Sequence, residues 1–298
     1  MRYSYFPGLL VSLAVSAFSA PAFELRDGDR VAMLGDALIE REQYAGWLEI
    51  AATTQFPDRS VIFRNLGWSA DTPAGESRNG LSLVMAGSET PDEGWQQLQI
   101  QLATYKPTVV LLGYGMAASL PGGQPAKQFG DDLERLIEKA PKSTGGGVRF
   151  LILGAPPRFE RPGEDPEKLR LHRDSLTEIN SVLQEIAKKR NIPFVSLADL
   201  KQDWAYSQNG IHLTGEGYRA VARHIEKALG WKPTAWDKGE SAAALRKHVL
   251  KKNEWFFNRS RPANMAYIFG FRKGEQGKNA GEIAEFDKLV AEEEAIIA

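Results

Sequence analysis

Five short apolar runs, separated by longer amphipathic stretches, constrain the fold of this 298-residue chain more than any other feature. Each run is rich in Val, Ile, Leu and Phe and is bounded by turn residues, as expected for strands covered on both faces. The runs are residues 30–34, 61–65, 108–112, 148–153 and 193–197. Because strands that alternate with helices form parallel sheets with crossover connections, we expect an α/β protein with a five-stranded parallel sheet between two helical layers.

The amphipathic stretches predict the crossover helices. They lie at residues 38–54, 92–105, 126–139, 166–190 and 214–229. Proline and acidic residues mark the starts at 91–93 and 165–167, and Thr214 is expected to be the N-cap of the last helix. Composition changes after Trp231, so residues 23–232 are taken as the main domain. Residues 233–298 are expected to form a helical and extended arm that packs on it, or alternatively to dock a protein partner.

Composition excludes several classes of protein. The net charge is −1, from 37 basic and 38 acidic residues, which provides no basic surface for nucleic acid or anionic lipid. The absence of cysteine excludes disulfides, thiolate metal sites and a cysteine nucleophile. Residues 1–22 have the layout of a signal peptide, with cleavage expected after Ala22. We therefore expect export to the periplasm or beyond, no membrane span in the remaining chain, and a small-molecule or carbohydrate ligand.

The carboxyl ends of parallel strands locate the expected functional site. Three of the predicted strands run into residues 35–38, 65–69 and 113–117, and residues 209–213 precede the last helix. We expect these four segments to meet along one rim of the sheet.

These four segments resemble the sequence blocks of the SGNH hydrolases, the GDSL-type esterases and lipases. In that family the first block contains a Gly-Asp-Ser whose serine is the nucleophile. A glycine in the second block and an asparagine in the third bind the oxyanion, and a late Asp-x-x-His supplies acid and base. Gly35, Asp36, Gly67 and His212 stand in this order and at matching spacings. The strings at 38–43, 65–69 and 253–257 further resemble a branch of secreted bacterial SGNH proteins.

The resemblance covers residues 28–229 and implies a flavodoxin-like three-layer α/β/α sandwich, ester hydrolysis and no cofactor. Three positions depart from the family pattern. Ala37 stands at the nucleophile position, and Ala117, or alternatively Ala118, stands at the oxyanion asparagine. Asn209 replaces the carboxylate three residues before His212, and we expect its amide oxygen to accept a hydrogen bond from the imidazole. Losing one oxyanion donor costs about 10²- to 10³-fold in turnover, and losing the nucleophile removes nearly all triad-dependent catalysis.

Other residues of the four segments have both structural and functional interpretations. Ser69, Thr72 and Ser119 are candidate replacement nucleophiles or ordinary loop residues. Asp36 is an acid or base beside the site, or a helix cap. Trp68 and Tyr114 form an aromatic wall of the cleft, or pack in the core. The remaining histidines, His172, His224 and His248, lie on predicted helices, and no two histidines have the spacing of metal ligands, so we predict no metal.

Two functions follow from these observations. The first is hydrolysis of acyl or acetyl esters of an extracytoplasmic carbohydrate or lipid, with His212 as base and the Gly67 N–H at the oxyanion. The second is ligand binding without catalysis, because Ala37 has no hydroxyl. The C-terminal arm adds the hypothesis of an accessory protein in a secreted assembly.

Overall fold

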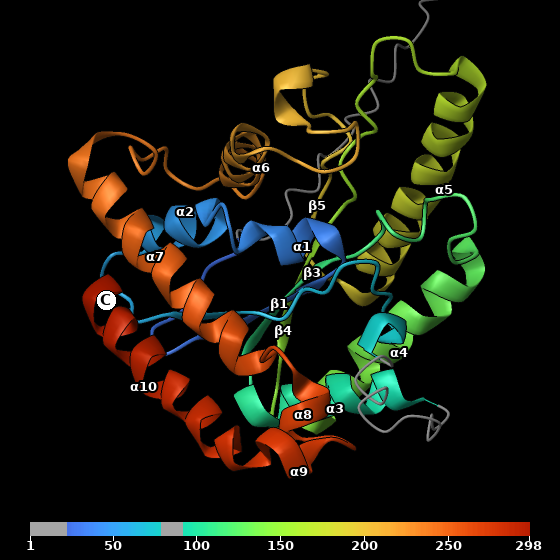
Figure 1. Cartoon of the computed structure of the whole chain (residues 1–298). Helices are drawn as coiled ribbons and strands as arrows, with labels where there is room; N and C mark the ends of the chain where they lie inside the picture. Colours follow the sequence, from blue (N-terminus) through green and yellow to red (C-terminus); the bar gives the residue numbers. More distant parts are fainter. Residues whose placement is uncertain (1–22, 79–91) are drawn as a thin grey trace, which may run out of the picture.

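A parallel five-stranded sheet forms the centre of the computed structural model, which describes residues 23–78 and 92–298 (Figure 1). The predicted signal peptide lies outside the described residues. The strand order is β2-β1-β3-β4-β5, with every neighbouring pair parallel. The strands are β1 (Arg30–Gly35), β2 (Ile62–Asn65), β3 (Val109–Gly113), β4 (Arg149–Leu153) and β5 (Phe194–Val195). All five lie where the apolar runs predict them.

Helices cover both faces of the sheet and make three layers. Figure 1 shows α1 (Ala37–Glu42), α2 (Trp47–Gln55) and α6 (Gly215–Ala228) on one side. The other side carries α3 (Glu93–Tyr105), α4 (Ala126–Thr144) and α5 (Pro166–Arg190). Alternate residues of β1 enter the two cores, since Met33 packs with α2 and α6, and Leu34 packs with α3 and α4. The predicted three-layer α/β/α sandwich is therefore confirmed.

Two of the predicted helices have different bounds in the structure. The stretch 38–54 is two helices and not one, because Gly46 adopts a left-handed φ of 71° between α1 and α2. A left-handed residue ends the helical hydrogen-bond ladder, and glycine adopts it at little steric cost. The stretch 126–139 extends to Thr144. Although Pro141 lies inside it, α4 continues up to Gly145, whose left-handed φ of 77° ends the helix.

The first turns of α5 and α6 follow the capping signals, whereas the Asp92 side chain at the start of α3 makes no capping hydrogen bond. The Asp165 carboxylate accepts hydrogen bonds from the amides of Glu167 and Lys168 at the start of α5. The Thr214 hydroxyl accepts from the Gly217 amide at the start of α6, as predicted for an N-cap. The α6 cap matters for function because it fixes the residues directly after His212.

Residues 233–298 are mainly helical. They contain α7 (Gly239–Ser260), α8 (Met265–Ile268), α9 (Lys273–Gln276) and α10 (Ala280–Ile297), and short 3-10 helices lie at Gly277–Asn279 and, before α6, at Trp204–Tyr206. We call residues 233–298 the arm. Figure 1 shows α7 and α10 side by side along the β2 edge of the sheet. The described helices include none that is both long and apolar enough to cross a membrane.

A buried ion pair joins the arm to the sheet domain. The Lys252 ammonium lies 2.6 and 2.5 Å from the two Glu49 carboxylate oxygens, and both side chains are at most 3% exposed. Lys252 also donates to the Phe63 carbonyl at 3.3 Å, and Arg246 donates to the Ala45 carbonyl at 2.9 Å. Val249 and Phe256 of α7 are buried in the two cores. The arm therefore shares its core with the sheet domain.

Candidate functional site

Asp36 connects the first and third strand ends. Its Oδ1 accepts from the Leu38 amide at 3.1 Å, so that it is the N-cap of α1. Its Oδ2 accepts from the amides of Gly115 and Ala117 at 3.1 and 2.9 Å. Complete burial raises the pKa of Asp36 to about 6 even though all three amides favour the carboxylate. The Asp36 carboxylate therefore connects two segments of the rim, and both of its oxygens already accept hydrogen bonds.

Ala37 is the first residue of α1, and its side chain is a methyl group that cannot attack a carbonyl. Only 9% of the residue is exposed. The hydroxyl of Tyr218 on α6 donates to the Leu38 carbonyl at 2.8 Å. This bond holds the start of α6 against α1, at a position six residues after His212.

The Gly67 amide already has a hydrogen-bond acceptor. It donates to the Asn65 side-chain oxygen at 2.9 Å, while the Asn65 amide nitrogen donates to the Ile39 carbonyl at 2.6 Å. A side chain at Gly67 would bring its Cβ within 2.4 Å of the Glu40 amide nitrogen. Glycine is therefore required at this position for close contact with α1, and its N–H is used inside the protein.

His212 and Asn209 form the most informative contact of the rim. The Asn209 side-chain oxygen accepts from the backbone amides of Ile211 and His212, at 3.1 and 2.9 Å. Its amide nitrogen consequently faces Nδ1 of His212, at 3.1 Å. Since an amide NH₂ can only donate, Nδ1 is the acceptor and the proton of the neutral imidazole is on Nε2. This orientation differs from the sequence-based expectation, in which the amide oxygen accepts from the ring.

His212 remains neutral to lower pH than a free histidine. Partial burial lowers its pKa, and the positive charge of Arg41 lowers it further. A neutral ring with the proton on Nε2 presents an N–H donor to the rim. It has no free lone pair with which to take a proton from a nucleophile.

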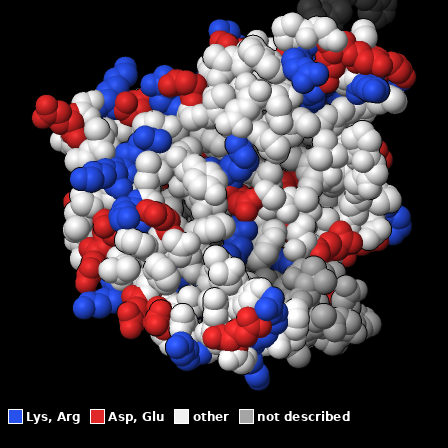
Figure 2. Space-filling view, viewed as in Figure 1, with Lys and Arg blue, Asp and Glu red and all other residues white. Residues whose placement is uncertain are grey.

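A hollow over α1 contains charged side chains close together (Figure 2). Glu40 of α1 accepts from Arg261 of the arm at 2.7 Å and from the Ser69 hydroxyl. Arg261 also donates to the Gly67 carbonyl at 2.8 Å, and its guanidinium lies 4.4 Å from the centre of the Trp68 ring. The arm thus supplies one charged residue of the rim.

Trp68 and Tyr114 have different surroundings. The Arg78 guanidinium lies 5.4 Å from the Trp68 ring centre, in addition to Arg261, so two cations contact this half-buried ring. Arg78 forms an ion pair with Asp71 at 2.9 Å, with both side chains fully buried. Tyr114 is 1% exposed and belongs to the core. Of the two aromatic residues, only Trp68 is close enough to the surface to contact a ligand.

The other candidate hydroxyls are buried or bonded. Ser119 donates to the Met116 carbonyl at 2.8 Å and lies 3.1 Å from Nε2 of His172, in a buried contact. Thr72 is 7% exposed and Ala117 is half-buried, with no donor in its side chain. Ser69 is exposed, and it is the one candidate whose hydroxyl lies at the hollow.

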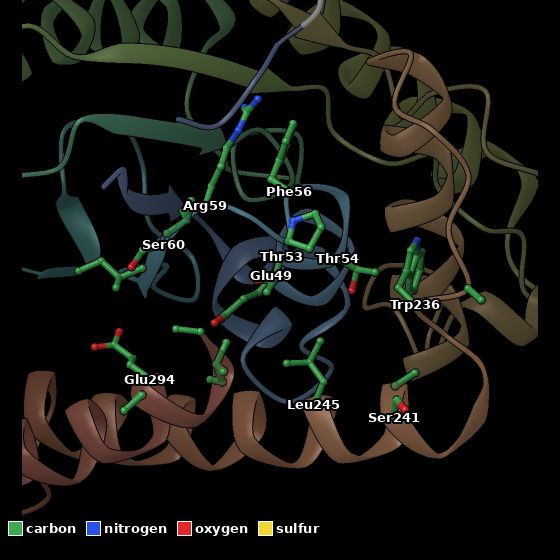
Figure 3. A pocket seen from close by; sticks show the side chains of 18 of the residues that line it. Glu49, Thr53, Thr54, Phe56, Arg59, Ser60, Trp236, Ser241, Leu245 and Glu294 are labelled. Atoms are coloured by element: carbon green, nitrogen blue, oxygen red, sulfur yellow. The ribbon is translucent and has the colours of Figure 1, made fainter. Parts of the chain in front are cut away.

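A cavity lies away from the rim. It has a volume of about 680 Å³ and is bordered by the end of α2, the residues before β2, and the arm. Figure 3 shows Phe56, Trp236, Leu245, Glu49 and Glu294 among the side chains that line it. Because it is at the amino end of β2, it is at the opposite end of the sheet from the rim. In the described part of the chain, no cluster of three or more His, Asp and Glu side chains could hold a metal ion.

The fold and the position of the rim define an α/β protein of the SGNH hydrolase type. Residues 33–220 match the model of the GDSL-like lipase/acylhydrolase family, and the chain belongs to that family. A search of the curated proteins finds no match.

Solved structures with TM-scores above 0.5 show the same fold at low sequence identity, and a further match has a score just below that value. A catalytic mutant of Axe2, an acetylxylan esterase from Geobacillus stearothermophilus, is 13% identical with a TM-score of 0.53, over 73% of this chain and all of that one. A GDSL-like lipase described as putative, from Parabacteroides merdae, is 15% identical with a TM-score of 0.51, over 71% and 100%. BT4096, a gut microbial diltiazem-metabolizing enzyme, is 18% identical with a TM-score of 0.49, over 71% of this chain but only 49% of its own length.

Sequence reasoning missed several residues of the site, among them Arg41, Asn65 and Arg261. Asn65 stands two positions before Gly67, the spacing of an Asx turn, which could have indicated that the Gly67 amide is bonded. Arg261 is remote in sequence and carries no local signal. Arg41 follows Glu40 in α1, and only the tertiary contacts distinguish their surroundings.

Proposed function

We propose that this chain is a ligand-binding member of the GDSL-like family that does not hydrolyse esters at its rim. The observation that carries the proposal is the Asn209–His212 contact, in which the amide nitrogen faces the ring at 3.1 Å. Together with the methyl group of Ala37, it removes both the nucleophile and the base of the family mechanism.

The oxyanion position supports the same proposal. A transition-state oxyanion needs donors that are free to bind it. The Gly67 amide donates to Asn65 instead, and Ala117 provides no side-chain donor. Each missing donor of this kind costs about 10²- to 10³-fold in turnover. A hydroxyl introduced at Ala37 alone would therefore leave most of the barrier in place.

We propose that the ligand is an acyl- or acetyl-substituted carbohydrate or lipid. The family includes lipases and acylhydrolases, and Axe2 is an acetylxylan esterase, which supports this class of ligand. The half-buried Trp68 offers an apolar surface, and the donors of the hollow offer hydrogen bonds to ligand oxygens. Neither group requires that the ester be cleaved.

The test is an assay of the mature protein with short-chain p-nitrophenyl esters, beside His212→Ala and Ser69→Ala. We expect equal, background rates for all three proteins. Isothermal titration with acetylated xylo-oligosaccharides should at the same time detect binding to the unchanged protein. Turnover above background that His212→Ala abolishes would overturn the proposal.

Ester hydrolysis by a different nucleophile is the second candidate, and one observation favours it. The Ser69 hydroxyl donates to the Glu40 carboxylate at the hollow, which is a hydroxyl paired with a base. Glu40 also forms an ion pair with Arg261 at 2.7 Å, so its carboxylate is shared between two donors. Turnover that Ser69→Ala removes and His212→Ala leaves unchanged would support this candidate.

We also propose that the chain is exported, on the basis of the layout of residues 1–22. Fusing residues 1–30 to a reporter that is active only outside the cytoplasm tests this. An active reporter is expected with the natural segment. Replacing Leu9 and Leu10 by arginine should abolish the activity because it interrupts the apolar region.

A further inference from the structure

We propose that the rim binds a carboxylate group of its ligand through Arg41 and His212. This inference rests on the proposed function, and it adds a carboxylate to the carbohydrate or lipid ligand proposed above as the group that the non-catalytic site recognises, in place of the acyl ester itself. Two observations point to it independently, one on each residue. They are an arginine without a counter-charge and a histidine held as a donor.

Arg41 has only one side-chain contact in the described part of the chain. Its Nη2 donates to the Gln208 side-chain oxygen at 2.7 Å. Its Nε is shielded from solvent and has no partner, and no described carboxylate lies within ion-pair distance of the guanidinium. The exposed Nη groups of this cation, and not the shielded Nε, are the donors that an anion at the surface can reach, and an arginine without a counter-charge favours such an anion.

The neighbouring carboxylates are already compensated. Glu40 accepts hydrogen bonds from Arg261 and Ser69. Glu42 accepts from the Leu48 amide at 2.6 Å, and burial raises its pKa to about 8, so that it is mostly uncharged at neutral pH. The positive charge of Arg41 is therefore not balanced from within α1.

The His212 ring adds a second donor near Arg41. The backbone amide of Gln208 donates to the His212 carbonyl at 2.9 Å, which joins the residue that Arg41 contacts to the histidine itself. The Asn209 amide keeps the ring proton on Nε2. Arg41 lowers the pKa of His212, as expected for a cation close to the ring.

A carboxylate fits these donors better than a neutral ester does. The guanidinium presents parallel N–H groups that match two carboxylate oxygens, and hydrogen bonds to a charged acceptor are about twice as strong as neutral ones. An ester carbonyl carries no charge to balance Arg41. The carboxylate can belong to a free acid such as acetate or to an acidic sugar such as a uronic acid.

The experiment is a titration of the full-length mature protein, followed by the NMR signals of the His212 ring and by calorimetry. The probes are acetate, galacturonic acid, the methyl ester of galacturonic acid, and galactose. We expect saturable shifts with at least one carboxylate. We expect at least tenfold weaker binding of the methyl ester, and no displacement by equimolar galactose.

Arg41→Gln should weaken carboxylate binding at least tenfold, whereas Arg219→Gln should leave it unchanged. Arg219 is the matched control because it pairs with Glu216 on the exposed surface of α6. Arg41→Lys keeps the charge without the planar fork, so an intermediate loss is expected, and it replaces the glutamine variant if that variant does not fold. His212→Gln should bind more strongly than His212→Phe, because glutamine can still donate.

Three results would overturn the inference. They are equal affinity for acid and methyl ester, carboxylate binding that Arg41→Gln and Arg41→Lys leave unchanged, and the absence of saturable binding by both acids. Equal affinity would leave the proposed non-catalytic function intact. Ester turnover that His212→Ala abolishes would instead remove the proposed function, so the two failures are distinguishable.

Discussion

Charged side chains are paired differently at the rim and at the junction between the arm and the sheet domain. At the junction, Lys252 and Glu49 are almost completely buried, and the ammonium bonds to both carboxylate oxygens and to a backbone carbonyl. At the rim, Arg41 has one neutral partner and an Nε donor with none. Buried charge that is fully paired holds a structure together, whereas a partly exposed cation without a counter-charge is available to an anionic ligand. The junction therefore stabilises the fold, and the rim is suited to recognise a ligand.

The largest expected effect concerns the rim and the tautomer of His212. In the Ala37→Ser/Ala117→Asn background, adding Asn209→Asp should raise esterase turnover by up to about 10⁴-fold, since losing the correct tautomer costs about that much in a serine protease. An aspartate can bond the two backbone amides with one oxygen and accept from Nδ1–H with the other. The measurement is kcat with p-nitrophenyl acetate.

Gln208→Glu in the same background is the control for that comparison, because it adds a negative charge one residue away from Asn209. A similar gain from Gln208→Glu, or no gain from Asn209→Asp, would contradict the assignment of the ring proton to Nε2.

The junction should show the next largest effect, on stability. Lys252→Met leaves the Glu49 carboxyl buried without its partner, and removing one member of a buried pair costs about 3–5 kcal/mol. Lys251→Met, on the exposed side of the same helix, should change the free energy of unfolding by less than about 1 kcal/mol. Urea denaturation measures both. Equal effects of the two substitutions would show that the buried pair does not hold the arm.

A pH dependence should follow from Glu42, whose pKa is raised from 4.5 to about 8 by burial and by the nearby Glu49 charge. The folded state binds the proton more tightly than the unfolded state, so this contribution to stability is fully present below about pH 4.5 and is lost as pH rises to about 8. The slope is at most about 1.4 kcal/mol per pH unit for one group.

Glu42→Gln should flatten this part of the stability profile between pH 5 and pH 8, because an amide does not titrate in that range. Glu254→Gln, which changes an exposed glutamate of α7, should leave the profile as it is. The profile of the unchanged protein would rise with pH in this window if the assignment to Glu42 were wrong and a paired carboxylate dominated.

The smallest effect is expected where the two regions meet, at Arg261. Lysine cannot bond Glu40 and the Gly67 carbonyl together while stacking on Trp68, so Arg261→Lys should cost about 1 kcal/mol of stability. Arg259→Lys, at an exposed ion pair with Asp287, should stay within about 0.5 kcal/mol. Thermal unfolding compares them, and identical midpoints would exclude a structural role for Arg261 at the rim.

The sheet was predictable from the sequence because burial on both faces requires continuous apolar runs, and those runs are visible without any partner. The separation of α1 from α2 was not predicted, although Gly46 was present in the stretch. A single glycine in an amphipathic pattern can lie within a helix or end it, and only the packing of α2 and α7 around it decides between these outcomes.

The site was predictable only in its position. The strand ends indicated which segments would lie together, but not which atoms would face each other. The direction of the Asn209 amide depends on two backbone N–H groups of the turn that follows it, and a residue type does not encode that direction. The counter-charges of Glu40 and Lys252 come from residues more than two hundred positions away in the chain.

The three backbone bonds of Asp36 affect how the Gly-Asp motif should be read. The carboxylate accepts hydrogen bonds from the amides of Leu38, Gly115 and Ala117 and so holds two strand ends together. This structural role does not depend on a serine at the next position. A Gly-Asp pair at this position therefore indicates that the ends of two strands are joined by hydrogen bonds to the aspartate. Whether a protein with this arrangement is also an esterase depends on the side chain at the next position and on which nitrogen of the histidine carries the proton.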